Sequence, residues 1–128
     1  MRFLLDTHTL LWAAFRRDLL SPRASRILTR PGAEMIVSAA SAWEIATKFR
    51  LGKLDFARDL ADNFISEVTA VGYRLLPISP ELALRAGRLP GDHKDPFDRM
   101  LAAQAIHEDL PILSNDPQFD LFGVRREW

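Results

Sequence analysis

Residues 1–12, MRFLLDTHTLLW, indicate the fold class of the chain. The run FLL at residues 3–5 is apolar at every position, as expected of a strand that is buried on both faces, and Asp6 ends it. From residue 7 to about residue 17 the apolar positions recur with helical spacing. A buried strand that leads directly into a helix is the beginning of a βα unit.

The same alternation continues to the end of the chain. Short apolar runs predict further strands at residues 35–38, 73–78 and 111–113, and an edge strand near Val124. Helical patterns lie at residues 22–30, 39–51, 56–71, 80–88 and 96–108, three of them begun by a capping residue and a proline: Ser21-Pro22, Ser79-Pro80 and Asp95-Pro96. We therefore expect an α/β fold: a single three-layer α/β/α domain over residues 1–128 with a short, mainly parallel twisted sheet.

Composition narrows the class of protein. The chain has 128 residues, of which 48% are hydrophobic and 27% charged, as in an ordinary single globular domain. The 17 basic and 17 acidic side chains cancel, so attraction to phosphate must come from a local patch or a bound cation. The absence of cysteine excludes disulfides, thiolate zinc sites and thiol nucleophiles. No apolar run approaches the roughly 18 residues of a membrane span, so we expect a cytoplasmic protein that does not bind membranes.

Acidic residues lie where the predicted strands end. Asp6 and Asp116 follow the first and last predicted inner strands, and Glu44 lies in the helix after the second strand. Asp98 lies in the first turn of the helix that Asp95 begins. Because ligands of open α/β sheets bind beyond the carboxyl ends of the strands, we expect four of these carboxylates, Asp6, Glu44, Asp98 and Asp116, at one edge of the sheet.

Each acid also has a purely structural explanation. Asp6, Asp98 and Asp116 are suited to the first turns of helices, and Glu44 can pair with Lys48 one helical turn later. For Asp95 we favour the role of N-cap. Together, however, four converging carboxylates repel one another, and a divalent cation removes that repulsion. Mg²⁺ and Mn²⁺ prefer carboxylate and water ligands, orient an attacking water and neutralise charge on a scissile phosphate.

The stretches that carry these acids resemble those of the PIN-domain ribonucleases, and among them the VapC-type toxins of bacterial type II toxin–antitoxin pairs. The resemblance covers essentially the whole chain in order and spacing, and it rests on LLDTHTLLW at 4–12, SAASAWEIATKFRLGKL at 38–54, HKDPFDRMLAAQA at 93–105 and ILSNDPQF at 112–119. It implies a Mg²⁺-dependent (or Mn²⁺-dependent) endoribonuclease that cleaves RNA, is usually a homodimer and is inhibited by a cognate VapB-type antitoxin.

The resemblance also implies roles for individual residues. The family's acids fall on Asp6, Glu44, Asp98 and Asp116; Asp98 rather than Asp95 takes the third place because the family pattern of two residues followed by Leu-Ala-Ala comes after it. We expect Asp6 and Asp98 to bind metal directly, and Glu44 and Asp116 to bind it directly or through water, or to act as general base. Small polar residues that the family places around the acids fall on Thr7, Ser38 and Asn115.

Other functions and residues stay open at this point. A Mg²⁺-dependent phosphohydrolase, a receiver-like domain or a non-catalytic binding module are the alternatives, although the chain lacks the Asp-x-Asp motif of the haloacid type and the late Lys of a receiver. We expect His8 to be a packed or exposed helix residue, and His93-Lys94 either a solvated loop or an RNA contact. Trp12 and Trp43 are expected to anchor the core or an interface. A solvated face is favoured over phosphate or antitoxin contact for five arginines: Arg16, Arg17, Arg23, Arg26 and Arg30.

Overall fold

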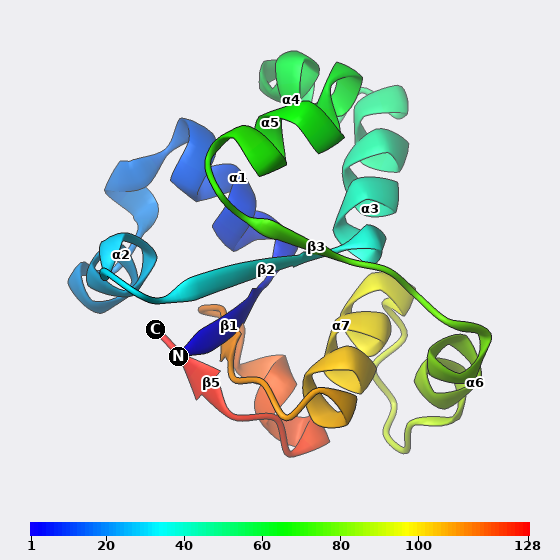
Figure 1. The fold of residues 1–128 in the computed structure, drawn as a ribbon. Helices are drawn as coiled ribbons and strands as arrows, with labels where there is room; N and C mark the ends of the chain where they lie inside the picture. Colours follow the sequence, from blue (N-terminus) through cyan, green and yellow to red (C-terminus); the bar gives the residue numbers. More distant parts are fainter.

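The computed structural model describes all of residues 1–128 and contains a single five-stranded sheet (Figure 1). Every pair of neighbouring strands is parallel, so the prediction of a mainly parallel sheet is confirmed. The strands follow the order β3-β2-β1-β4-β5 across the sheet. They are β1 (Arg2–Leu5), β2 (Glu34–Ser38), β3 (Arg74–Leu76), β4 (Ile112–Leu113) and β5 (Arg126–Glu127).

Helices connect the strands and begin where the sequence predicts caps. The hydroxyls of Ser21 and Ser79 accept hydrogen bonds from the N–H groups of Ala24 and Leu82, at the start of two of the helices. None of the helices combines the length and the apolar character needed to cross a bilayer. They are α1 (Thr7–Phe15), α2 (Pro22–Thr29), α3 (Ala39–Arg50), α4 (Arg58–Asp62), α5 (Phe64–Ala70), α6 (Pro80–Arg88) and α7 (Pro96–His107), with 3₁₀ turns η1 (Arg17–Leu19), η2 (Asp55–Ala57) and η3 (Pro117–Phe122).

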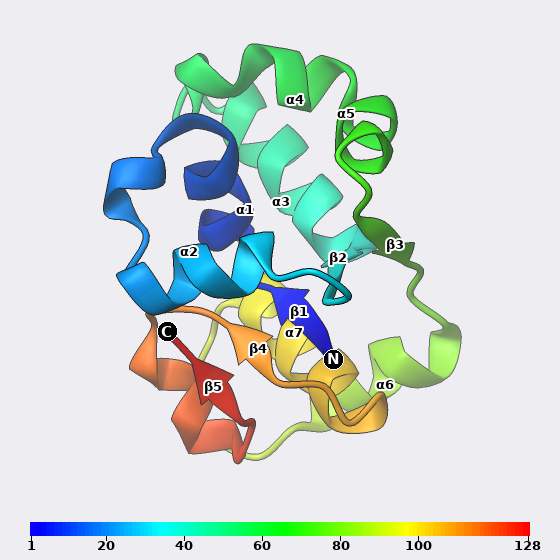
Figure 2. The same cartoon turned by 60° about the vertical axis from the view of Figure 1, so that its left-hand side comes forward.

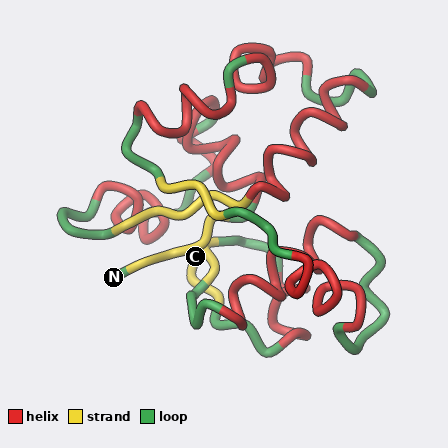
Figure 3. Tube along the Cα trace, turned by 45° about the vertical axis from the view of Figure 1, so that its right-hand side comes forward, coloured by secondary structure: helices red, strands yellow, loops and turns green.

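The sheet separates two cores, because successive side chains of a strand point to opposite faces. Phe3 and Leu5 of β1 join a cluster that contains residues of α1, α2, α3, α4 and α5. Leu4 joins a second cluster with Leu101 of α7 and Phe119 of η3, and α6 packs on the outside of α7. Figures 2 and 3 show the strands between these two groups of helices, which confirms the three-layer α/β/α architecture.

The prediction of one continuous helix over residues 56–71 is wrong. The segment is divided into η2, α4 and α5, with a break at Asn63, whose backbone has φ −132° and ψ 39°. The backbone N–H and the side-chain amide of Asn63 both donate to the carbonyl of Asp59, so Asn63 closes α4 before α5 begins at the next residue. The break changes which apolar residues face inward, so Leu60 and Val68 are buried whereas Val71 is exposed.

The parallel sheet also determines where the acids meet. Leu5 of β1 pairs with Leu113 of β4, so the next residues, Asp6 and Ser114, lie beside each other at the carboxyl edge. Helix α3 begins directly after β2, and α7 leads into β4. The first turns of both helices therefore lie at this edge, and they carry Glu44 and Asp98.

Candidate active site

Acidic side chains from four separate segments line one hollow of about 370 Å³ at the carboxyl edge of the sheet. Asp6 follows β1, Glu44 lies on α3, Asp98 lies in the first turn of α7 and Asp116 precedes η3. The other lining residues are Asp95, the polar or basic Thr7, His8 and Lys48, and the apolar Leu11, Trp12, Leu54 and Phe56. The fold therefore brings together the acids that the sequence placed at one edge.

Asp6 is the most deeply placed of these acids, with only 3% of its surface exposed. Its Oδ2 accepts a hydrogen bond of 2.6 Å from the Ser114 hydroxyl and lies 3.1 Å from Nδ1 of His8. Its side chain does not cap α1, so the structural explanation for this acid is not realised. A carboxylate that is buried without capping a helix is available for another role.

Glu44 is also buried, and its two oxygens differ. Oε2 accepts a hydrogen bond from the ammonium group of Lys48, one turn along α3. Oε1 is buried and has no hydrogen-bond partner within the protein. Unpaired buried carboxylate oxygens are costly, so Oε1 is the atom of this hollow most in need of a donor or a cation.

Asp95 and Asp98 have different roles in the structure, as the sequence predicts. Asp95 Oδ1 accepts hydrogen bonds from the N–H groups of Phe97 at 2.9 Å and Asp98 at 3.2 Å, so Asp95 is the N-cap of α7. Asp98 is half-buried, and its Oδ2 lies 2.8 Å from Nε2 of His93. The loop before α7 thus contributes His93 to the site through Asp98.

Asp116 combines a capping role with a place in the hollow. Its Oδ1 accepts a hydrogen bond of 3.0 Å from the N–H group of Gln118, at the start of η3. It also lines the acidic hollow. Capping and cavity lining, which the sequence presents as competing explanations, coexist in this residue.

The small polar residues predicted around the acids, Thr7, Ser38 and Asn115, do not all lie near them. Thr7 lines the hollow, and its hydroxyl lies 2.9 Å from that of Ser41, whereas Asn115 is exposed beside His8. Ser38 does not contact the acids: its hydroxyl donates to Gln104 Oε1 and accepts from the N–H of Ala40, so it links β2 to α7 and caps α3.

Ser114 is the polar neighbour that the sequence reasoning missed. Its hydroxyl donates to Asp6, and its Oγ also accepts a hydrogen bond from the N–H group of Asp116, so it connects two of the acids. The signal was present in the sequence, because Ser114 follows β4 directly, as Asp6 follows β1. Residues that follow paired parallel strands in register lie side by side.

Burial and mutual repulsion change the acidity of two of these carboxyls. Burial raises the pKa of Asp6 to about 7, with the negative charge of Glu44 adding to it and the Ser114 hydrogen bond opposing it. Burial likewise raises the pKa of Asp98 to about 6; the hydrogen bond from His93 opposes the rise, and the charges of Asp6 and Asp95 add to it. The site is thus a concentration of negative charge that lacks sufficient compensation within the chain.

The raised pKa of Asp6 predicts how the stability of the metal-free protein depends on pH. An ordinary aspartate has a pKa near 3.8, so between about pH 4 and about pH 7 the folded state binds a proton that the unfolded chain has released. The free energy of unfolding should therefore fall as the pH rises through this window, with a contribution from Asp6 that approaches about 1.4 kcal/mol per pH unit.

Urea unfolding in a chelator at several pH values measures this slope. An Asp6→Asn variant, which lacks the titrating group, should lose less stability than the parent over the same window. Parallel slopes for the two proteins would show that the pKa of Asp6 is not raised in the folded state.

The donor set suits a hard divalent cation, although each carboxylate is engaged by the protein. The donors are carboxylate oxygens, one of them the buried and unpaired Oε1 of Glu44, and Mg²⁺ and Mn²⁺ prefer such ligands together with water. No three acidic or histidine side chains already form a closed ligand set. Instead, Asp6, Glu44 and Asp98 contact His8, Lys48 and His93.

Aromatic and basic residues complete the surroundings. Trp12 is half-buried and its ring lies 4.7 Å from that of His8, whereas Trp43 is exposed, with its ring 4.8 Å from that of Phe97, and does not belong to the core. His8 is half-buried on α1 against Trp12, as expected of a packed helix residue, and it also lines the acidic hollow.

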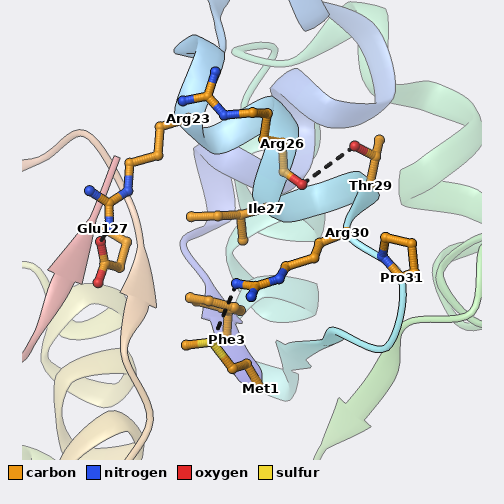
Figure 4. A pocket seen from close by; sticks show the side chains of 9 residues that line it. All are labelled: Met1, Phe3, Arg23, Arg26, Ile27, Thr29, Arg30, Pro31 and Glu127. Carbon is orange, nitrogen blue, oxygen red and sulfur yellow. Dashed lines mark hydrogen bonds and ion pairs between the residues drawn. The ribbon is translucent and has the colours of Figure 1, made fainter.

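The arginines of α2 border a different hollow, of about 620 Å³, near the start of β1 (Figure 4). Arg23 pairs with Glu127, and Arg30 Nη1 lies 3.5 Å from Met1 Sδ. All five arginines of the basic segment are exposed, and the solvated face stays a prediction for them. The acids follow the end of β1, so the two hollows lie at opposite ends of that strand.

Comparison with known proteins agrees with this architecture. The PIN domain family matches residues 3–124. No curated protein matches the chain in sequence.

Several solved structures share the fold over nearly the whole chain. One is VapBC2 from Rickettsia felis, bound to a fragment of its promoter DNA. The two chains superpose with a TM-score of 0.70 at 17% identity, and the match covers 99% of this chain and 98% of the other. DNA-bound VapBC from Salmonella typhimurium has a TM-score of 0.67 at 20% identity, with 99% and 97% covered. FitAcB from Neisseria gonorrhoeae has a TM-score of 0.61 at 18% identity, with 98% and 96% covered. At these identities the similarity is one of fold.

Proposed function

The chain belongs to the PIN domain family, and on that premise we propose that it is a divalent-metal-dependent endoribonuclease that hydrolyses RNA phosphodiester bonds. The observation that carries the proposal is the hollow in which Asp6, Glu44, Asp98 and Asp116 meet from four segments, with the N-cap Asp95 also in its lining. Such a hollow repels the RNA backbone unless a cation is present, and with a cation it is suited to phosphodiester hydrolysis.

We assign the metal, Mg²⁺ or Mn²⁺, to Asp6 and Asp98, with Glu44 and Asp116 as ligands directly or through water. When bound, the cation lowers the pKa of water and neutralises charge on the scissile phosphate. Ser114 fixes one oxygen of Asp6 through its hydrogen bond of 2.6 Å, and Asp95 holds the first turn of α7 in which Asp98 lies.

Two acids are suited to accept a proton from the attacking water. Glu44 Oε1 is buried at the hollow and lacks a protein donor, and Asp116 lines the same hollow. Either carboxylate can act as general base once a water is within hydrogen-bond distance. Lys48, which holds the other oxygen of Glu44, is a cation placed to meet the phosphate or to be displaced by metal.

The test of this function is cleavage of RNA by the purified protein with and without Mg²⁺ or Mn²⁺. We expect cleavage that requires the cation, is lost in chelator, and returns when the cation is restored. Hydrolysis by water leaves linear phosphate ends, whereas attack by the neighbouring 2′-hydroxyl leaves a cyclic phosphate. Cyclic ends, or cleavage that persists in chelator, would contradict the proposal and indicate a metal-independent ribonuclease.

We further propose that the protein is the toxin of a toxin–antitoxin pair, is active as a homodimer and is inhibited by a VapB-type antitoxin. An apolar hollow of about 330 Å³ between α1, α4 and α5 supports a helical partner, because amphipathic helices bind such grooves through their apolar faces. Its apolar lining includes Leu10, Ala14, Leu60, Val68 and Val71.

Expression of the chain alone in bacteria should arrest growth, and co-expression of the gene just upstream should relieve the arrest. The Asp98→Asn variant, which we expect to be inactive, serves as the control for arrest caused by overexpression itself. Arrest that continues in the presence of a stable, intact partner would contradict the assignment of that partner.

A further inference from the structure

The contacts of Asp6 point to a role for the histidine two residues later. Oδ2 of Asp6 lies 2.6 Å from the Ser114 hydroxyl and 3.1 Å from Nδ1 of His8. Two groups from different elements thus lie against the same carboxylate oxygen. The Ser114 hydroxyl, at the end of β4, donates a hydrogen bond to it, and Nδ1 of His8, in the first turn of α1, lies within ion-pair distance of it. Residues that hold a carboxylate in this way fix its orientation.

The ring of His8 is itself held in place by two tryptophans. Its centroid lies 4.7 Å from that of Trp12, one turn along α1, and 6.4 Å from that of the C-terminal Trp128. The two indole rings are 5.8 Å apart, so the three rings form one cluster at the side of the acidic hollow. A ring that is packed on two sides has little freedom to turn away from Asp6.

The surroundings of the ring also indicate which nitrogen carries its proton. A neutral imidazole carries one N–H, on either Nδ1 or Nε2. An ionised Asp6 only accepts hydrogen bonds, so the contact requires the proton on Nδ1. Nε2 is buried without a hydrogen-bond partner, and a buried acceptor without a partner there is better tolerated than a buried N–H without one.

We propose that His8 is a positioning residue, which donates from Nδ1 to Oδ2 of Asp6 and holds that carboxylate in its orientation toward the hollow. The inference rests on the proposed function only where it concerns metal: if Asp6 is a ligand, its orientation sets the affinity for the cation. Loss of an outer partner of a ligand typically weakens metal binding by about 10- to 100-fold.

Two substitutions separate the two ring nitrogens. His8→Asn places an amide N–H at the position of Nδ1, whereas His8→Gln places one at the position of Nε2. His8→Leu removes both donors and retains an apolar side chain beside Trp12. The matched control is His107→Asn, the same change at an exposed histidine that contacts Arg85 at the far end of α7.

The first readout is the tautomer of His8 in the metal-free protein near pH 8, from the ¹⁵N shifts of the imidazole nitrogens, assigned by their loss in His8→Asn. We expect the proton on Nδ1, although free histidine prefers it on Nε2. A proton on Nε2 would overturn the inference. This measurement needs no metal and no RNA, so it is decisive even if the proposed function fails.

The second readout is the Mn²⁺ dissociation constant from calorimetry. We expect His8→Asn and His107→Asn to stay within a few-fold of the parent, and His8→Gln and His8→Leu to bind about 10- to 100-fold more weakly. Equal affinities for His8→Asn and His8→Gln would overturn the positioning role. A parent that binds no Mn²⁺ would contradict the proposed function instead, and the tautomer would then decide the inference about His8.

Discussion

The Asp98→Asn variant should lose RNA cleavage by about 100-fold or more while its metal-free form melts no lower than the parent. Asparagine keeps a side-chain oxygen of nearly the same size but lacks the negative charge that a hard cation requires. Removing that charge also relieves the repulsion that, together with burial, raises the pKa of Asp98 to about 6. A residue that served only the start of α7 would show the opposite pattern, a small loss of stability with activity intact.

Thermal melts with and without Mn²⁺, together with cleavage rates, distinguish these explanations. Binding to the folded state raises stability by mass action, so Mn²⁺ should raise the melting temperature of Asp98→Asn less than that of the parent. The control is Asp95→Asn, which removes one charge from the same hollow but keeps a good N-cap. Loss of cleavage in Asp95→Asn with parental cleavage in Asp98→Asn would reverse the assignment of the two acids.

The Leu101→Ala variant should lose about 2 to 5 kcal/mol of stability. Leu101 is fully buried on α7, in the core that also contains Leu4 and Phe119, and its loss leaves a cavity between the sheet and the helix that carries Asp98. A small domain has only about 5 to 15 kcal/mol of total stability, so this one substitution removes a large share of it.

Urea unfolding measures this loss, with Leu84→Ala as the matched control. Leu84 is 58% exposed on α6, so the same change there should alter the free energy of unfolding by no more than about 0.5 kcal/mol. Similar losses at the two positions would contradict the packing of α7 against the sheet.

The sequence was sufficient for the layers of the fold because its signals are local and strong. FLL at residues 3–5 is a strand buried on both faces, and Ser21-Pro22 and Asp95-Pro96 begin helices where they are expected to. The prediction of one continuous helix over residues 56–71 is wrong because the apolar pattern gives no signal for its break. Its apolar spacing is continuous, and the break at Asn63 depends on backbone geometry that periodicity does not describe.

The position of the acids was also predictable, but their partners were not. Asp6 and Glu44 reach one hollow because parallel strands end at a common edge, a rule that needs only the order of strands and helices. The contact between Ser114 and Asp6 depends on the register of β1 with β4, and that of His93 with Asp98 on the path of a loop. The sequence shows that Ser114 follows a strand as Asp6 does, but the strand register and the path of the loop are tertiary features that the residue pattern alone does not specify.

The central claim is that the hollow formed by Asp6, Glu44, Asp98 and Asp116 binds the catalytic cation. A crystal structure of the protein with Mn²⁺, examined by anomalous diffraction, tests it most directly. We predict a Mn²⁺ ion in this hollow with carboxylate oxygens of Asp6 and Asp98 as direct ligands. Saturating Mn²⁺ that leaves this hollow without an ion, or that binds only elsewhere on the protein, would contradict the claim.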